Sequence, residues 1–303
     1  MNSLDRTIDD FLRYIQEERG FSPHTTKAYR HDLQRFRTFL EQYDPESFEV
    51  LSRIDRQTVR HFLGKEYEAG LSARTVARRL ATLKSWCKFL LRTGQRQDNP
   101  TIHIRTPKIP KSLPDFLDET AVEELLSAAD QATFNGRLDR AVMELFYSTG
   151  MRLGELVNLN IGDVDWNQQV VKVHGKGNKE RLIPFGERTK LAMDYYLKKR
   201  GKTAVQATAN SPLFTNRKGQ RIAPRTIQRH ISNYFKKLAT DRSYGPHVLR
   251  HSFASHLLDR GADIRAVKEF LGHSSLSSTQ IYTHIQPEKM KQIYRQAHPH
   301  GSK

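Results

Sequence analysis

The N-terminal third of the chain repeats apolar residues at intervals of three and four, the spacing of a helix with one buried face. The segments with this spacing are residues 7–19, 22–43, 55–70 and 72–92. Ser22 followed by Pro23 is a typical helix start, because the hydroxyl caps backbone amides and proline fits the first turn. The pattern predicts an N-terminal domain of four helices over residues 1–92.

The fourth segment also carries a row of arginines. Its apolar positions predict a face that packs in the core: Val76, Leu80, Leu83 and Phe89. Arg74, Arg78 and Arg79 are then expected to lie toward the other side. For each arginine taken alone, a solvated helix face is an equally good interpretation.

A proline-containing stretch separates this domain from the rest of the chain. Prolines stand at positions 100, 107, 110 and 114, and proline removes a backbone donor and prevents helix. Residues 93–111 are therefore predicted to be an extended linker. Arg105, Lys108 and Lys111 give the linker positive charge that suits a phosphate backbone.

Residues 112–303 are predicted to form a second domain with a different pattern. A helix breaks at Gly150, and residues 168–186 alternate around the sequence GKGN, as a β-hairpin does. Further helices are predicted over residues 223–239, 246–261 and 262–273, the last ended by Gly272. The segment from residue 274 to 284 is predicted to be a helix that carries Tyr282.

Charge narrows the choice of partner. The 303 residues include 50 Lys and Arg against 33 Asp and Glu, a formal net charge of +17. Residues 51–111 hold 14 basic and 4 acidic side chains, and residues 201–250 hold 10 and 1. Two separate basic blocks indicate that both halves of the chain contact a polyanion, and nucleic acid is the polyanion we expect.

Two further features bear on the compartment. Cys87 is the single cysteine and lies in an apolar helical pattern, so we expect a small core residue and no intramolecular disulfide. The first residues lack a basic-then-apolar signal, and no stretch is long enough to cross a membrane. We expect a cytoplasmic protein without a membrane partner.

Six residues of the second half have the chemistry for attack on a phosphodiester: Arg152, Lys176, His247, Arg250, His273 and Tyr282. Arginines grip phosphate oxygens in pairs, and histidines donate or move protons. A tyrosine becomes a covalent nucleophile once its proton is removed. Spacing puts His247 and Arg250 on one face of a helix.

A metal site is the main chemical alternative. His247 and His251 have the spacing of two ligands on a zinc-binding helix, with His256, His273 and His284 nearby in the sequence. The glutamate of HExxH is absent, and Arg250 would oppose a dication. No acidic cluster accompanies the six residues, which argues against two-metal chemistry. We expect no metal and no other cofactor.

Several phrases of the chain resemble the tyrosine site-specific recombinases, the phage integrase family. They are TGMRLGEL, GKGNKER, HVLRHSFASHLL, LGHSSLSSTQIYTH and the closing AHP. The resemblance is greatest to the bacterial Xer recombinases, with a XerC-like ending. It extends to SPHTTKAYRHDLQRF and SARTVARRLATLKSW, which look like the family's N-terminal core-binding helices, so it covers nearly the whole chain.

The resemblance implies a role for each of the six residues. Tyr282 would attack the scissile phosphate and form a 3′-phosphotyrosyl link. Arg152 and Arg250 would clamp the non-bridging oxygens, and Lys176 would protonate the departing 5′ oxygen. His247 would assist proton transfer from the tyrosine, and His273 would donate a hydrogen bond to the phosphate.

The implied fold is mainly α-helical. An N-terminal four-helix, SAM-like DNA-binding domain would precede a mostly helical catalytic domain with a small antiparallel sheet. The expected substrate is a double-stranded DNA recombination site, held by four protomers on two sites. A second Xer-type recombinase and a septal DNA translocase are expected as further partners. Candidate DNA-contacting residues are Lys27, Arg30, Arg74, Arg78, Arg225 and Arg229.

The resemblance implies resolution of chromosome dimers for segregation at cell division. Two alternatives stay open from the sequence. One is a mobile-element integrase of the same family, which differs in its DNA target. The other is a DNA-binding or architectural protein that does not cleave, which would leave Tyr282 without a role. After Tyr282, a short apolar stripe at helical spacing comprises Met290, Ile293 and Tyr294. Packing on its own domain is one interpretation, and the family resemblance implies instead that the stripe docks on a neighbouring protomer.

Overall fold

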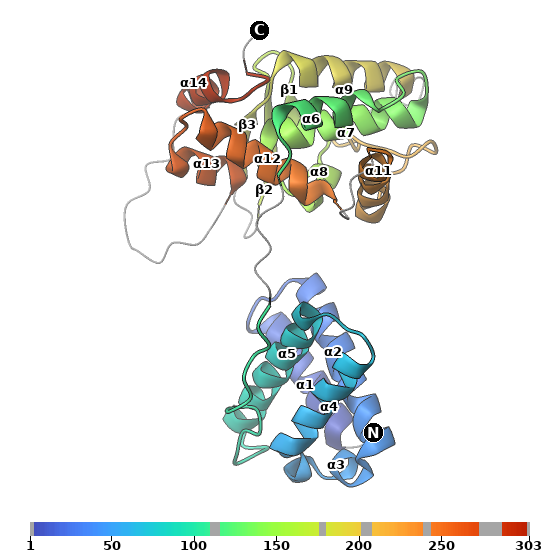
Figure 1. The fold of residues 1–303 in the computed structure, drawn as a ribbon, viewed down its shortest axis with the longest axis vertical. Helices are drawn as coiled ribbons and strands as arrows, with labels where there is room; N and C mark the ends of the chain where they lie inside the picture. Colours follow the sequence, from blue (N-terminus) through green and yellow to red (C-terminus); the bar gives the residue numbers. More distant parts are fainter. Residues whose placement is uncertain are drawn as a thin grey trace. The chain divides into compact units, whose positions relative to one another are not determined.

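The computed structural model describes residues 3–109, 116–175, 180–200, 208–238, 244–272 and 287–301, without the side chains of Glu49 and Pro287. The chain divides into two compact units, residues 1–111 and 112–303 (Figure 1). Each unit has its own hydrophobic core. Within the described ranges, no helix is both long and apolar enough to cross a membrane.

The N-terminal unit is helical. Its elements are α1 (Ser3–Glu17), α2 (Pro23–Tyr43), α3 (Pro45–Glu49), α4 (Arg56–Glu68) and α5 (Ala73–Arg92). The four predicted helices are confirmed, and the sequence interpretation missed the short α3. Ser22 and Ser72 accept hydrogen bonds from the amides of Thr25 and Thr75, so each is the cap of the helix that follows it.

The core of this unit includes Phe11, Phe36, Phe62 and Trp86, one large side chain from each of the four long helices. Cys87 lies in the same core, as predicted, and burial raises the pKa of its thiol to about 12. The segment expected to be a linker, residues 93–111, belongs to this compact unit. Ile104 is packed in the core, and Lys84 donates to its carbonyl oxygen at 2.8 Å.

One prediction for the fourth helix is wrong. Arg79 does not lie outward with its neighbours, because its side chain is buried and forms an ion pair with Glu66. Asp32, 1% exposed, lies 3.8 Å from Arg79 Nε and also pairs with Arg78. A buried guanidinium is stable only beside such carboxylates, and these come from α2 and α4. Neighbouring helices therefore decided where this arginine lies.

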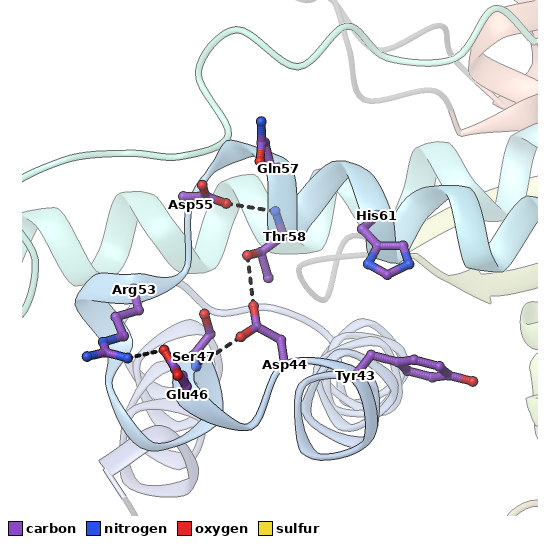
Figure 2. Close-up of a pocket in the computed structure, with 9 residues that line it drawn as sticks. All are labelled: Tyr43, Asp44, Glu46, Ser47, Arg53, Asp55, Gln57, Thr58 and His61. Carbon is purple, nitrogen blue, oxygen red and sulfur yellow. Dashed lines mark hydrogen bonds and ion pairs between the residues drawn. The ribbon is translucent and has the colours of Figure 1, made fainter.

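A hollow of about 470 Å³ opens where α2, α3 and α4 meet (Figure 2). Its carboxylates are engaged in holding the helices. Asp44 accepts from the Ser47 amide and, at 3.0 Å, from the Thr58 hydroxyl, and Asp55 caps α4 through the Thr58 amide. The polar groups of the hollow thus serve the fold of this corner.

The second unit is built around α7. Its helices are α6 (Glu119–Ser127), α7 (Phe134–Thr149), α8 (Leu153–Asn158), α9 (Glu187–Arg200), α11 (Pro224–Lys237), α12 (Pro246–Asp259), α13 (Ile264–Leu271) and α14 (Pro287–Ala297). Most of α7 is buried, because α6, α9, α11 and α12 pack around it. Gly150 ends α7 at φ 58°, a conformation that glycine adopts at low cost.

A small antiparallel sheet completes this unit. It has the order β1 (Val164–Asp165), β2 (Val170–His174), β3 (Glu180–Pro184). The strands β2 and β3 pair from Val170 with Pro184 to His174 with Glu180, which confirms the predicted hairpin strands. The mainly helical fold with a small antiparallel sheet is also confirmed.

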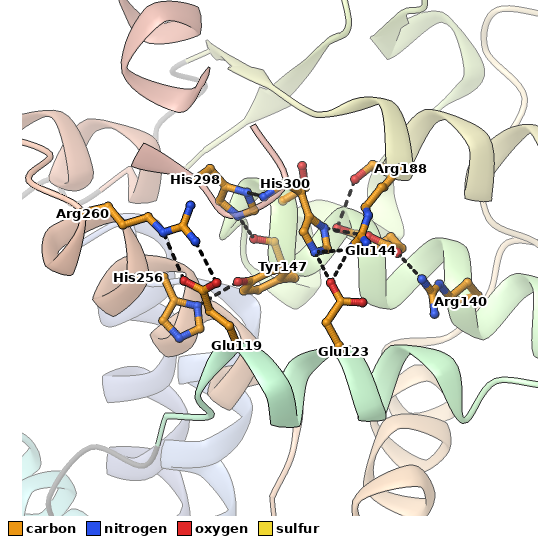
Figure 3. A network of polar contacts seen from close by, with 12 residues as sticks. Glu119, Glu123, Arg140, Glu144, Tyr147, Arg188, His256, Arg260, His298 and His300 are labelled. Carbon is orange, nitrogen blue, oxygen red and sulfur yellow. Dashed lines mark hydrogen bonds and ion pairs between the residues drawn. The ribbon is translucent and has the colours of Figure 1, made fainter. Parts of the chain in front are cut away.

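The C-terminal stripe packs on its own domain in this structure, and its docking on a neighbouring protomer stays a prediction. Met290 and Tyr294 belong to the core, and the Tyr294 hydroxyl lies 2.5 Å from that of Ser148. Beyond α14, His298 Nε2 donates to the Tyr147 carbonyl at 3.0 Å, and the ring of His300 lies between Glu123 and Glu144 (Figure 3). Helix α14 thus packs against β3 and α12, and its Tyr294 reaches Ser148 near the end of α7.

Candidate active site

Arg152 lies where the chain leaves α7 and enters α8. Gly150 turns the backbone, and Arg152 then occupies the N-cap position of α8. Its backbone amide donates to Glu155 Oε2 at 2.7 Å, and its Nη1 donates to Oε1 at 3.0 Å. The side chain remains 43% exposed. A helix start with an exposed guanidinium is well suited to an anion.

Arg250 comes from α12 and reaches the same place. Its guanidinium donates to the Gly150 carbonyl and, at 2.8 Å, to the Leu271 carbonyl. Burial, followed by repulsion from Arg152, lowers the pKa of Arg250 to about 10. The structure thus brings together two of the six predicted residues, one from each end of a long stretch of chain.

A third arginine, which the sequence interpretation missed, joins them. Arg181 on β3 donates to both oxygens of Glu155, at 3.1 and 2.8 Å. Glu155 is almost fully buried, and burial alone would raise the pKa of its carboxyl group. Hydrogen bonds from Arg181 and from the Arg152 amide outweigh burial and lower that pKa, so Glu155 is ionised at neutral pH.

This arginine cluster, Arg152, Arg181 and Arg250, places three positive charges close together. Arg152 and Arg181 both donate to the carboxylate of Glu155, and, after burial, the charges of both arginines lower the pKa of Arg250. Repulsion between them is unfavourable until an anion arrives, and a phosphate accepts several N–H donors at once. The arrangement can hold a phosphate and stabilise negative charge that develops on it.

Of the other four predicted catalytic residues, only His247 lies among the residues that the structure describes. His247 is exposed on α12, one turn before Arg250. Lys176, between β2 and β3, lies outside the described residues, as do His273 and Tyr282. His273 directly follows Gly272, the C-cap residue of α13.

The metal alternative finds no support in the described part of the chain, where no group of three or more His, Cys, Asp and Glu is placed to hold an ion. His256 is buried, and its Nδ1 lies 2.8 Å from the Tyr147 hydroxyl. Its neighbours on the zinc-like pattern, His247 and His251, are exposed. Helix α12 thus directs the three imidazoles to different surroundings.

The candidate DNA-contacting residues lie at the surface. Arg225 and Arg229 are exposed on α11, Arg74 is exposed on α5, and Lys27 is exposed on α2. Two candidates have acidic partners: Arg30 donates to Asp9 at 3.2 Å, and Arg78 pairs with Asp32. Arg78 therefore also balances a buried charge in its own unit.

The missed residues had weak signals in the sequence. Glu155 stands three positions after Arg152, and an acid at the third helical position commonly accepts from the N-cap amide. Arg181 stands on a strand in the phrase KER, where nothing local separates it from a solvated arginine. Its role depends on Glu155 and on α13, both distant in the sequence.

Comparison with known proteins agrees with this geometry. Residues 115–289 match the model described as "Phage integrase family", and residues 8–94 match "Phage integrase, N-terminal SAM-like domain". The chain belongs to the phage integrase family. It is a tyrosine recombinase, an enzyme that cleaves and rejoins DNA in site-specific recombination.

Relatives within the family include proteins with two Xer names. The chain is 40% identical to "Tyrosine recombinase XerD" of Staphylococcus haemolyticus over 296 residues, which covers 98% of this chain and 99% of the relative. It is 38% identical to "Tyrosine recombinase XerC" of Oceanobacillus iheyensis over 305 residues, covering 100% and 99%. These similar identities support the Xer group without choosing between its two names.

A solved structure shows the same fold. The lambda integrase tetramer bound to a Holliday junction aligns with a TM-score of 0.71 and 18% identity, covering 93% of this chain and 80% of the integrase chain. At this identity the likeness concerns the fold alone.

Proposed function

We propose that this recombinase acts through a 3′-phosphotyrosyl intermediate formed by Tyr282. The observation that carries the proposal is the convergence of Arg152 and Arg250 at the end of α13, directly before His273. Two fixed guanidinium groups substitute for metal ions where charge builds up on a phosphate. The energy of the broken bond is conserved in the phosphotyrosine, so rejoining needs no cofactor.

The other roles follow the order of events at the phosphate. His247 assists removal of the proton from Tyr282, and its exposed position near Arg250 suits contact with a bound substrate. Lys176 protonates the 5′ oxygen as it leaves, and His273 donates a hydrogen bond to a non-bridging oxygen. These assignments rest on the match between residue type, sequence phrase and the arginine pair.

DNA is contacted from both units in this proposal. Arg225 and Arg229 lie one turn apart and exposed on α11, and Lys27, Arg30, Arg74 and Arg78 supply charge in the N-terminal unit. Residues 1–92 would act as the core-binding domain and residues 112–303 as the catalytic domain. Residues 93–111 would link them while packing in part on the first.

The biological role proposed is resolution of chromosome dimers, in the cytoplasm, for segregation at cell division. Full-length similarity to proteins named XerC and XerD supports it. A tetramer on two DNA sites is proposed because the integrase of the same fold is a tetramer on a Holliday junction. A second Xer-type recombinase and a septal DNA translocase complete the proposal.

Trapping the enzyme on its own DNA tests the proposal. Cells that produce the protein are lysed in denaturant, and DNA that stays attached to it is sequenced. One short chromosomal site with a 3′ attachment to Tyr282 is expected, and Tyr282→Phe should yield none. Attachment sites at the ends of a mobile element would replace dimer resolution with integration. Undiminished adduct in the Tyr282→Phe variant would remove the assigned nucleophile.

A further inference from the structure

The last turn of α13 gathers the arginine cluster in an ordered way. The carbonyl oxygens of its final residues are acceptors that a helix leaves unpaired. That of Phe270 accepts from Arg181 Nε at 3.1 Å, that of Leu271 from Arg250 at 2.8 Å, and that of Gly272 from Arg152 at 2.9 Å. The negative end of a helix also favours cations. Three consecutive carbonyls thus hold three arginines from three different elements.

Arg181 differs from the other two arginines in where its donors point. Its Nε, Nη1 and Nη2 are directed at Phe270 and at Glu155, and its side chain is only 15% exposed. Arg152 is far more exposed, at 43%. Arg181 is therefore committed to protein partners, whereas Arg152 presents a surface to a ligand.

The guanidinium of Arg181 lies close to Gly272, the glycine of the phrase LGH, and this explains why a glycine stands there. Gly272 has φ +63°, and a Cβ at this position would come within 2.9 Å of Arg181 Cζ and Nη1. Any larger residue would strain the backbone and displace the guanidinium. The geometry of Gly272 and the position of Arg181 are therefore coupled.

We propose that Arg181 is a positioning residue, which fixes Arg152 through Glu155 and fixes the end of α13 through the Phe270 carbonyl. One side chain on β3 then ties together the start of α8, the sheet and the residue before His273. Arg181 touches no substrate in this scheme. It sets the spacing of the two arginines that grip the phosphate, and this inference rests on the proposed function of that pair.

The experiment compares four variants: Arg181→Ala, Arg181→Lys, Arg250→Ala and Arg200→Ala. Arg200 is the matched control, because it is a buried arginine that also donates to backbone carbonyls, those of Pro212 and Leu213. Binding of inorganic phosphate is measured by titration. The phosphate binding that is lost in Arg250→Ala is assigned to the arginine cluster. Binding and single-turnover cleavage of a trapped DNA site are measured in parallel.

Arg181→Ala should weaken phosphate binding at the cluster about tenfold and slow cleavage of bound DNA about 10²-fold, the usual cost of a misplacement near 1 Å. DNA affinity should change less than about threefold. Arg181→Lys should be equally slow, because an ammonium cannot bridge Glu155 and Phe270 in the same geometry. Arg200→Ala should lose stability while its cleavage rate stays near that of the wild type.

Three results would overturn the inference. Full activity of Arg181→Lys would show that charge alone is needed, and an equal loss of DNA affinity would show direct grip of the substrate. An equal cleavage defect in Arg200→Ala would show general destabilisation. If the wild type forms no covalent adduct, the proposed function fails instead, and the phosphate titration still decides whether Arg181 positions the cluster.

Discussion

Nη2 of Arg152 donates a hydrogen bond to the carbonyl oxygen of Gly272, 2.9 Å away and 120 positions later in the chain. The bond joins the start of α8 to the end of α13. Because Arg250 also bonds to this end, at Leu271, the two arginines have a fixed separation before any DNA binds. Preorganised donors of this kind stabilise a transition state without reorganisation at the moment of reaction.

The role of Lys176 can be tested by changing the leaving group. Lys176→Ala should cleave an ordinary phosphodiester very poorly, by about 10² to 10⁴-fold, the usual contribution of a general acid. A substrate with sulfur at the 5′-bridging position needs no acid and should restore cleavage. Single-turnover rates on matched substrates measure both effects. Equal defects on the two substrates would mean that Lys176 only binds.

Cleavage is expected to proceed without metal. Arginines supply the positive charge, and the described residues contain no group of ligands for an ion. Adduct formation in a large excess of chelator should match that in its absence. If chelator abolishes adduct formation and one specific metal restores it, the histidines of α12 become the candidate ligands.

Binding to DNA should depend steeply on salt. Replacing Arg225 and Arg229 with alanine should weaken site binding and reduce the slope of log affinity against log salt by about 0.9 for each lost phosphate contact. The exposed pair Arg6 and Arg13 on α1 is the matched control, because residues 1–50 carry a net charge of −3. An unchanged slope in the α11 variant would mean that Arg225 and Arg229 face solvent and do not contact DNA.

In the N-terminal unit, Arg74 is a cleaner test than Arg78. Removing Arg78 would also take away a partner of buried Asp32 and so reduce stability. Arg74→Ala should lower DNA affinity while the unfolding temperature stays at the wild-type value. A parallel drop in both would indicate a structural role for Arg74.

Acid should destabilise the C-terminal tail of the second unit, residues 288–303. Burial, followed by repulsion from His300, holds the pKa of His298 well below its usual value and outweighs the opposing effect of the hydrogen bond from Nε2 to the Tyr147 carbonyl. Its Nδ1 accepts from the His300 amide. Burial also lowers the pKa of His256. Below about pH 6.5 the unfolded chain takes up protons that the folded chain refuses, so stability falls with pH by up to ~1.4 kcal/mol per unit for each group.

Denaturant unfolding between pH 7.5 and 5 measures this slope. His298→Gln should flatten it, since an amide can still donate to the Tyr147 carbonyl and does not titrate. His251→Gln, at an exposed position on α12, is the control and should leave the slope unchanged. The neighbours of the tail on α6 and α7, Glu123 and Glu144, are present in all variants. A slope that His298→Gln leaves intact would contradict the assignment.

The C-terminal tail should be needed for the stability of the second unit. Met290 and Tyr294 are core residues of the second unit, so removing residues 288–303 should destabilise that unit. Loss of an apolar side chain of this size from a core commonly costs about 2 to 5 kcal/mol. Calorimetry of the truncated protein gives the direct measurement. An unchanged unfolding temperature would show that the tail adds little to the domain.

The sequence by itself determined the local elements of this protein. Periodicity placed the long helices, Gly150 and Gly272 marked two helix ends, and alternation placed β2 and β3. The phrases around Arg152 and Arg250 identified the chemistry. These features are local, because helix spacing, caps and turns depend on residues a few positions apart.

Only the tertiary structure decided which surfaces meet. Arg78 and Arg79 are adjacent and alike in the sequence, yet one is half-exposed and the other is buried against Glu66 of another helix. Arg181 became part of the site because Glu155 and Phe270 converge on it from 26 positions before and 89 after. A charged side chain follows the partner that offsets its desolvation, and that partner is chosen by the packing of distant segments.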